Sequence, residues 1–190
     1  MNSFYSTDTL RQIGFKEIGN KVLISIKASI YGAENITIGN NVRIDDFCIL
    51  SGKIKIGNNI HIAAFSALYG GSVGITVDDF SNISSRVCIY AISDDYSGET
   101  MTNPTIPDKY KNVLKEPVHI NRHVILGSGC TVLPGIILAE GSSFGAMTLI
   151  NKNSEPWSIN VGIPFRKIKE RSNHLLELEK MFLLEQNENE

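Results

Sequence analysis

Aliphatic residues recur at every sixth position over most of the chain. The first series starts at Ile26, is interrupted at Gly32, and continues through Ile38, Ile44, Leu50, Ile56, Ile62 and Leu68. A second series comprises Val77, Ile83 and Ile89, and a third comprises Ile120, Leu126, Val132, Leu138, Phe144 and Ile150. The offset between the first two series contains Tyr69, Gly70 and Gly71. So regular a spacing predicts a repeat architecture.

A sustained period of six fits neither an amphipathic helix nor an alternating strand, but a short strand followed by a sharp corner produces it. Gly39, Asn40 and Asn41 are typical corner residues here, because glycine and asparagine tolerate left-handed backbone angles. Hexapeptides of fixed period are the signature of a parallel β-helix. We therefore predict an all-β fold in which three hexads form one triangular coil. The alternative, a β-sandwich, repeats irregularly and alternates with period two.

Two segments break the period. Residues 91–117 form a polar insertion with three prolines, longer than a loop that merely connects two strands, and such loops usually carry function. Near the end, residues 172–186 place Leu175, Leu178, Met181 and Phe182 on one helical face, behind a cap at Ser172 or Asn173. We predict an N-terminal extension and β-helix over 1–170, and a C-terminal helix and tail over 171–190 that packs on a coil or a subunit.

Composition excludes several classes of protein. With 190 residues, 42% hydrophobic and 20% charged, the chain can bury a core and is not a disordered segment. The net charge of -2 gives no general reason to expect binding to nucleic acid or to an anionic membrane. Neither a signal peptide nor an apolar run of the roughly 18 residues needed to span a bilayer is visible, so we expect a cytoplasmic protein.

Cysteine and histidine usage argues against a metal site. Cys48, Cys88 and Cys130 lie in apolar segments without zinc-type spacing, so we expect buried free thiols and no metal. A zinc-dependent hydratase on a β-helix needs three converging histidines, whereas only His119 and His123 lie near each other in sequence.

The segments IGNNVRI (38–44), IGNNIHI (56–62) and VGIPFRKIKE (161–170) resemble the hexapeptide-repeat acyltransferases over about residues 20–170. ISSR (83–86), DDYSG (94–98) and PTIPDKYKN (104–112) are most similar to nucleotide-sugar N-acyltransferases that act on dTDP-4-amino-4,6-dideoxyglucose. This resemblance implies a left-handed parallel β-helix and a homotrimer. It also implies acetyl-CoA or another acyl-CoA as co-substrate, bound in the groove between neighbouring subunits, and active sites that draw residues from two chains.

The acceptor is predicted from a departure from the family pattern. Many members that acetylate a hydroxyl use a loop histidine as general base, but Asp94, followed by Asp95, stands at that position here. A carboxylate is a weak base for an alcohol, whereas a neutral amine attacks through its own lone pair and needs only to be oriented. We predict N-acylation, with Asp94 holding the amine, Ser84 as a hydrogen-bond partner and Glu140 as a second carboxylate from across the interface.

Each of these assignments has an ordinary structural alternative. Asp94 would also suit the start of a turn, and Glu140 would suit a solvated corner. If the acceptor is a hydroxyl, His123 is the remaining base, although a histidine at a corner is more often a surface residue. His61 and His119 lie beside inward-pointing isoleucines and are expected to face outward.

The predicted ligand contacts follow the resemblance. Gly127, Gly129, Gly145 and Ala146 would let pantetheine approach the backbone, although corner sterics alone also demand small residues. Gly162, Pro164, Arg166, Lys167 and Lys169 match the segment that holds the adenine and phosphates of CoA in the family, and the three cations suit a polyanionic ligand. For the sugar nucleotide, the candidates are Lys109, Tyr110 and Lys111, together with Asn82 and Tyr90.

The sequence thus predicts a cytoplasmic acyl-CoA-dependent N-acyltransferase for a nucleotide-linked amino sugar, serving surface polysaccharide synthesis such as that of lipopolysaccharide O-antigen. An O-acetyltransferase acting on a sugar hydroxyl is the nearest alternative. A β-helix without catalytic activity is the alternative from a different class.

Overall fold

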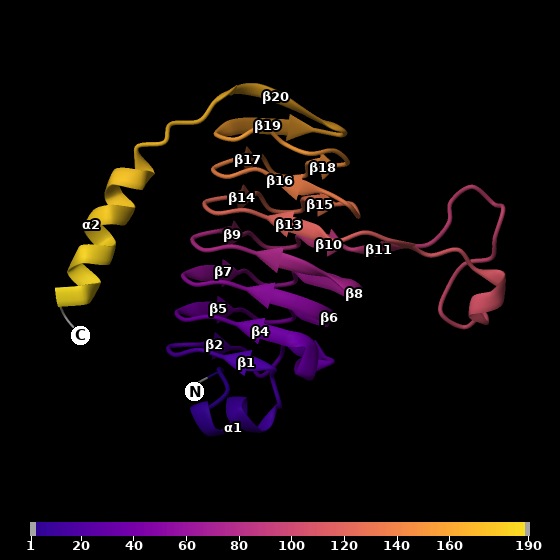
Figure 1. Ribbon diagram of the computed structural model, residues 1–190, viewed down its shortest axis with the longest axis horizontal. Coiled ribbons are helices and arrows are strands. Elements are labelled where there is room, and N and C mark those ends of the chain that lie inside the picture. The colour runs from indigo at the N-terminus through magenta and orange to yellow at the C-terminus, as the bar shows by residue number, and fades with distance from the viewer. Residues whose placement is uncertain (1–2, 189–190) are drawn as a thin grey trace.

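The structure, a computed structural model, describes residues 3–188 and is a parallel β-helix with one projecting arm and a terminal helix (Figure 1). The short helix α1 (Thr7–Gln12) precedes the first strand. Ser6 caps α1 by accepting a hydrogen bond from Thr9 N at 3.2 Å, and Leu10 is buried. The three sides of the β-helix are called faces 1, 2 and 3 below.

Faces 1 and 2 form one sheet because β6 (Ile49–Ile56) and β8 (Ala67–Val77) run through the corner between them. The other strands of face 1 are β3 (Ser29–Tyr31), β10 (Cys88–Tyr90), β15 (Thr131–Val132) and β18 (Leu149–Ile150). Those of face 2 are β1 (Glu17–Ile18), β4 (Ile36–Ile38), β13 (Val118–Ile120) and β16 (Ile137–Leu138). A short 3₁₀ helix, η1 (Ala33–Asn35), precedes β4.

Face 3 is a separate sheet whose strands pair in parallel until the last hairpin. Its order is β2 (Leu23–Ile24), β5 (Val42–Ile44), β7 (Ile60–Ile62), β9 (Asn82–Ile83), β14 (Ile125–Leu126), β17 (Ser143–Phe144), β19 (Ser158–Gly162) and β20 (Phe165–Glu170). Only β20 is antiparallel, and it ends the stack of coils.

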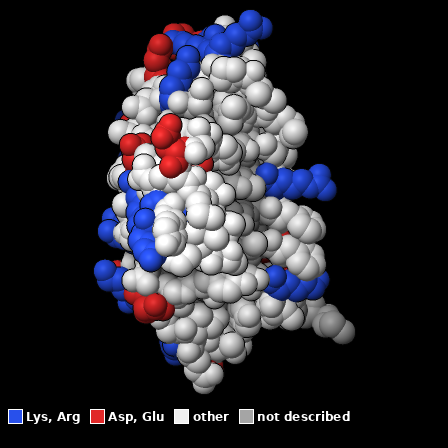
Figure 2. All heavy atoms as spheres, turned by 90° about the vertical axis from the view of Figure 1, so that its right-hand side faces the viewer, with Lys and Arg blue, Asp and Glu red and all other residues white. Residues whose placement is uncertain are grey.

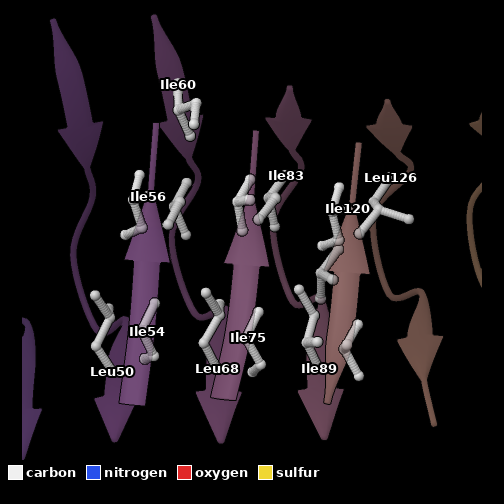
Figure 3. Packing of buried hydrophobic residues seen from close by; sticks show 14 of the residues in the cluster. Leu50, Ile54, Ile56, Ile60, Leu68, Ile75, Ile83, Ile89, Ile120 and Leu126 are labelled. Carbon is white, nitrogen blue, oxygen red and sulfur yellow. The ribbon is translucent and has the colours of Figure 1, made fainter. Parts of the chain in front are cut away.

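The predicted inward positions form the core (Figure 3). Leu50, Leu68 and Ile89 pair across successive coils, and each is fully buried. The prediction was wrong at Ile26, which is 51% exposed, whereas Ile24 is buried. The η1 turn between β3 and β4 shifts the phase by two residues, so the period counted back from Ile38 does not reach the first coil.

The corners contain the residues that the repeat predicts. At corner B, between faces 2 and 3, Asn41, Asn59 and His123 have φ of 54°, 56° and 60°. A ladder of side chains also links the coils here, since Asn58 Oδ1 accepts from Asn40 N at 2.8 Å and Asp79 Oδ1 accepts from Asn58 N at 2.7 Å. Left-handed backbone angles and side-chain acceptors together turn the chain at each coil.

The outward positions of face 1 carry no charge. They are Ser29, Tyr31, Ile49, Ser51, Ala67, Tyr69, Cys88, Tyr90, Thr131 and Leu149. Face 2 carries Glu17, Lys55 and His119, and face 3 carries Arg43, His61 and Lys169. Figure 2 shows most of the charged side chains of the visible surface on the left of the view, and further Lys and Arg side chains that project at its right edge.

The arm and the terminal helix leave the β-helix on opposite sides (Figure 1). The arm is the predicted insertion, with β11 (Ile92–Ser93) antiparallel to β12 (Leu114–Lys115) and a 3₁₀ turn, η2 (Asp108–Tyr110). At its root, Ala91 N donates to Tyr69 O at 2.9 Å and Glu116 N donates to Ala91 O at 3.0 Å. Helix α2 (Leu175–Glu188) follows a hydrogen bond from His174 N to Ser172 Oγ, at the predicted cap. Leu178 and Met181 remain 53% and 59% exposed, so only part of the predicted apolar face packs on the chain's own coils.

The core predicts a clear difference between two leucines. Leu126→Ala removes a fully buried side chain and should lower the free energy of unfolding by about 2–5 kcal/mol, because a cavity remains between fixed coils. Leu184→Ala, on α2 and 64% exposed, should change it by less than about 0.5 kcal/mol. Chemical denaturation followed by circular dichroism measures both, and equal losses would contradict this account of the core.

Candidate active site

Corner A, between faces 3 and 1, brings Ser84 into line with the predicted cofactor glycines. Ser84 N donates to Leu126 O at 3.0 Å, Gly127 N to Phe144 O at 2.8 Å, and Gly145 N to Asn160 O at 2.8 Å. Ser84, Gly127 and Gly145 therefore occupy the same place on three successive coils. Residues separated by 61 positions form one continuous edge, as a ligand lying parallel to the β-helix would require.

The close stacking of the coils alone requires glycine at two of these positions. A Cβ on Gly127 would lie 2.7 Å from Ala146 N, and a Cβ on Gly145 would lie 2.8 Å from Val161 Cγ1. Ala146, in contrast, is exposed on the outer side of the corner. The small residues leave the backbone of corner A uncovered, whether or not a cofactor uses it.

The terminal hairpin carries the predicted cationic patch beyond Gly145. Arg166 and Lys169 are exposed on β20, Gly162 ends β19, and Pro164 lies in the turn between the two strands. Lys167 Nζ lies 2.6 Å from both Glu155 Oε2 and Glu170 Oε1, and these carboxylates raise the pKa of Lys167. Lys167 is therefore the least available of the three predicted cations.

A further cation at this end was missed by the sequence reasoning. Lys152 Nζ lies 5.1 Å from the centre of the Phe165 ring, beside the hairpin. The sequence did not reveal this contact, because it depends on the register of β20.

The two aspartates of the arm have different surroundings. Asp95 Oδ1 accepts from Ser97 N at 2.8 Å, and Asp95 Oδ2 accepts from Thr100 Oγ1 at 2.7 Å. These hydrogen bonds, those with Ser97 foremost, lower the pKa of Asp95 to about 2. Asp94 is exposed and accepts only a long bond from Asn103 N at 3.3 Å. Asp95 therefore organises the arm, and Asp94 is the carboxylate that remains available.

Within one chain, Asp94 and Ser84 do not meet. Ser84 precedes the face 1 strand β10, whereas Asp94 lies beyond the opposite end of that strand, in an arm that projects away from the coils (Figure 1). Extended residues advance about 3.3 Å each, so the separation is on the order of 20 Å. Glu140 lies at corner B, next to Trp157, whose backbone N–H donates to Glu140 O at 2.9 Å.

The predicted nucleotide contacts in the arm are partly engaged with one another. Lys109 Nζ lies 4.8 Å from the centre of the Tyr110 ring, and Lys111 Nζ lies 3.1 Å from Asp108 Oδ1. On face 1, Tyr90 stacks on Tyr69 with ring centres 5.2 Å apart. Burial, followed by the nearby Cys88, raises the pKa of Tyr90 to about 12.

His123 is not the surface residue that its corner position suggested. It is 6% exposed, stacks on Phe80 at 5.3 Å, and its Nε2 lies 2.8 Å from Glu179 Oε2 on α2. Arg122 also pairs with Glu179, and the Phe80 and Phe182 rings meet edge to face, so polar and aromatic contacts both join α2 to corner B. The sequence could not show this contact because 56 residues separate its partners.

Face 3 contains a second cluster that sequence reasoning missed. His61 Nε2 and Arg43 Nε each lie 2.7 Å from a different oxygen of Asp45. Although burial raises the pKa of Asp45, the hydrogen bonds from His61 and Arg43 outweigh it and lower that pKa. His61 and His119 both face outward, as predicted.

A groove of about 580 Å³ lies between face 3, corner B and α2. Arg43, His61 and Asn82 form its floor, because they are paired neighbours on β5, β7 and β9. Asn82 was predicted to contact the sugar nucleotide. It lies on β9, two residues before Ser84 of corner A.

The remaining predictions concern thiols, metals and membranes. Cys48 and Cys130 are buried, but Cys88 is only half-buried on face 1. Burial raises the pKa of Cys48 to about 11. Among residues 3–188, no three His, Cys, Asp or Glu side chains are grouped so that they could hold a metal ion. In the same range, no helix has the length and apolar character to cross a membrane.

Comparison with known proteins identifies both the repeat and its relatives. A family model described as bacterial transferase hexapeptide (six repeats) matches residues 35–70. The chain is 49% identical over 176 residues to a dTDP-4-amino-4,6-dideoxy-D-glucose acyltransferase from Escherichia coli, covering 91% of both chains.

Solved structures of AntD, an N-acyltransferase from Bacillus cereus, are 52% identical to the chain. The D94A variant, bound to dTDP and coenzyme A, has a TM-score of 0.96 and matches 97% of this chain and 100% of its own. The S84C variant, bound to dTDP-4-amino-4,6-dideoxyglucose and coenzyme A, has a TM-score of 0.95 over 97% and 99%. AntD with dTDP and 3-hydroxybutyryl-CoA has a TM-score of 0.95 over 98% and 100%. The predicted hexapeptide β-helix is thereby confirmed.

Asp95 should control the order of the arm. Asp95→Ala removes the acceptor for Ser97 and Thr100, so amide hydrogen exchange over residues 96–112 should accelerate while the exchange of the coils stays unchanged. Glu99→Ala, an exposed carboxylate in the same arm, is the matched control and should have no such effect.

The contribution of Asp95 to the order of the arm should depend on pH. Since the pKa of Asp95 is lowered to about 2, its stabilising effect is complete above the unfolded-state pKa of about 3.9 and is lost as the pH falls towards 2. Unchanged exchange in Asp95→Ala would contradict the organising role.

Proposed function

Because the chain belongs to the hexapeptide-repeat acyltransferases, we propose that it transfers an acyl group from acyl-CoA to the 4-amine of dTDP-4-amino-4,6-dideoxyglucose. The enzyme class follows from family membership, and the acceptor is carried over from the relatives of known activity. The observation that carries the proposal is the combination of Ser84 on the uncovered edge of corner A with an available carboxylate at Asp94. AntD was crystallised with substitutions at the same two residue numbers, which supports this choice of residues.

In the proposed reaction the acceptor amine, in its neutral form, attacks the thioester carbonyl. The new C–N bond forms, the C–S bond breaks, and the proton lost from nitrogen is taken up by the departing thiolate. Asp94 orients the amine and stabilises the ammonium that develops on it. Ser84 Oγ donates a hydrogen bond to the carbonyl oxygen as that oxygen gains negative charge. Glu140 lies at corner B, and we assign it a smaller role in this reaction than Asp94.

Acyl-CoA is proposed to lie along corner A, with pantetheine beside Gly127, Gly145 and Ala146. The adenine and phosphates then reach the terminal hairpin, where Arg166 and Lys169 are exposed and Lys152 adds a third cation. AntD binds 3-hydroxybutyryl-CoA, so a donor longer than acetyl-CoA should be tested alongside it.

We propose a homotrimer in which face 1 of each copy lies around the three-fold axis. Face 1 is the side of the β-helix without outward charges, and its burial would cost no desolvation of ions. Corner A and the root of the arm lie at its two ends, so ring closure brings Ser84 of one copy towards Asp94 of the next. This arrangement would unite two residues that a single chain holds apart.

We also propose that the enzyme acts in the cytoplasm. We propose a role in the synthesis of a surface polysaccharide such as O-antigen, as expected for a nucleotide-linked acylamino sugar. Transfer to a sugar hydroxyl is the alternative function, and it is disfavoured because His123 is buried and bound to Glu179.

The activity is tested by release of the CoA thiol from acetyl-CoA and 3-hydroxybutyryl-CoA, with dTDP-4-amino-4,6-dideoxyglucose as acceptor. Asp94→Asn should lower kcat by about 100-fold or more, because the amine loses the charge that stabilises its ammonium. Asp108→Asn, whose carboxylate is fully exposed in the same arm, should retain the wild-type rate. An unchanged rate in Asp94→Asn would exclude the assigned role, and turnover with hydroxyl acceptors only would favour the O-acetyltransferase.

The trimer is tested with a matched pair of threonines. Thr131→Lys places a charge on face 1 and should dissociate the trimer in size-exclusion chromatography with light scattering. Thr76→Lys, an outward threonine of face 2, should leave it intact. A trimer that survives the first change would show that face 1 is not the interface.

A further inference from the structure

Corner A carries large side chains at the position where its backbone is left-handed. This position has φ between 60° and 75° and is occupied on five successive coils by Phe47, Phe65, Arg86, Gly129 and Met147. Corner B uses Asn41 and Asn59 at its own left-handed position, and asparagine and glycine adopt such angles at the least cost. A large side chain that is kept at a costly backbone angle is evidence of a role for that side chain.

Arg86 is the charged member of this column. The side chains of Phe65, one coil below it, and Met147, two coils above it, are exposed and apolar. Arg86 is itself exposed, and no carboxylate of residues 3–188 pairs with it. The other arginines are either bonded within the chain or already assigned to CoA, and they are Arg11, Arg43, Arg122, Arg166 and Arg171. Arg86 is therefore a cation that nothing within the described part of its own chain neutralises.

Assembly changes the surroundings of this cation. In the proposed trimer, corner A lies where neighbouring copies meet, so Arg86 is removed from water beside Phe65 and Met147. An arginine in such surroundings needs a carboxylate partner, because an unpaired charge is costly to desolvate. A three-fold rotation about an axis parallel to the β-helix keeps every residue at its own height. The carboxylate should therefore come from the same coil of the next copy.

The arm supplies a carboxylate at this height. It leaves the coil that contains Arg86, because β10 runs into the arm and β13 completes that coil after it. Asp95 is engaged within the arm, and Asp108 is paired with Lys111. Asp94 is exposed and accepts only one long hydrogen bond, of 3.3 Å, among the residues that the structure describes. Asp94 is thus the available anion that matches the available cation.

We propose that Arg86 of one copy binds Asp94 of the next copy and is a positioning residue for the reaction. The inference rests on the proposed function, which brings that Asp94 to Ser84. Ser84 and Arg86 are two residues apart, so their Cα atoms are at most about 7 Å from each other, a span that an arginine side chain covers. The guanidinium holds one oxygen of the Asp94 carboxylate, and the other oxygen remains for the acceptor amine. Arg86 acts through Asp94 and does not contact the reacting atoms.

Steady-state kinetics separate positioning from substrate binding. Arg86→Gln should lower kcat by about tenfold or more and leave both KM values nearly unchanged, because only the placement of Asp94 is lost. Arg86→Lys keeps the charge and should recover part of kcat. The double variant Arg86→Gln/Asp94→Asn should be no slower than Asp94→Asn alone, since both changes act through one carboxylate. Arg11→Gln, an exposed arginine of α1, is the matched control and should keep the wild-type rate.

Mixed trimers test whether the pair is formed between copies. Chains with Arg86→Gln are co-assembled with chains that carry Asp94→Asn. Each mixed ring then contains one contact at which a native Arg86 faces a native Asp94, so activity should exceed that of either variant by itself. A pair formed within one chain would give no such contact, and the absence of any gain would overturn the proposal.

Glu116 provides the control carboxylate, because it is exposed at the root of the same arm. The effect of Glu116→Gln should add to that of Arg86→Gln, whereas non-additivity with Glu116 in place of Asp94 would overturn the assigned pair. A raised KM with unchanged kcat in Arg86→Gln would make Arg86 a substrate contact and would also overturn it. If Arg86→Gln does not assemble, Arg86→Lys takes its place in the double variant and in the mixed trimers, with the same expected outcomes. A wild type without N-acylating activity would instead refute the proposed function, whatever the variants show.

Discussion

The parallel backbone ladder between successive coils is the interaction on which the rest of the structure depends. Each coil donates to the next at the same positions, as Ser84, Gly127 and Gly145 do at corner A. The ladder therefore converts positions on successive coils into continuous columns of side chains. The buried aliphatic column, the uncovered edge at corner A and the polar floor of the groove all result from this conversion, and each would be lost if one coil slipped in register.

Much of the fold could be predicted because the period of six is written directly in the sequence. The inward residues, the Gly and Asn corners and the insertion over 91–117 were all visible as repeats or as interruptions of repeats. Ile26 was misplaced because η1 adds residues to the first coil, and a shift of phase cannot be seen where the repeat itself is weak.

The site was less predictable because it depends on which columns become neighbours. The sequence placed Asp94 at the position of the loop histidine, but only the hydrogen bonds of the arm show that the Asp95 carboxylate is engaged there and the Asp94 carboxylate is largely not. The burial of His123 depends on α2 returning to corner B, and the Arg43, Asp45 and His61 cluster depends on the register of β5 and β7. The absence of charge on face 1 also emerges only after residues from six strands are placed side by side.

The root of the arm has a consequence for how such enzymes can diversify. Ala91 is fully buried, and its backbone forms hydrogen bonds with both Tyr69 and Glu116. The backbone ladder is therefore continuous beneath the arm, and β13 pairs with β8 as the next strand of face 2. Changes of length or sequence beyond this junction need not be compensated in the core. The arm can therefore change as an independent module. Evolution or protein engineering can alter what the enzyme recognises without altering how the β-helix folds.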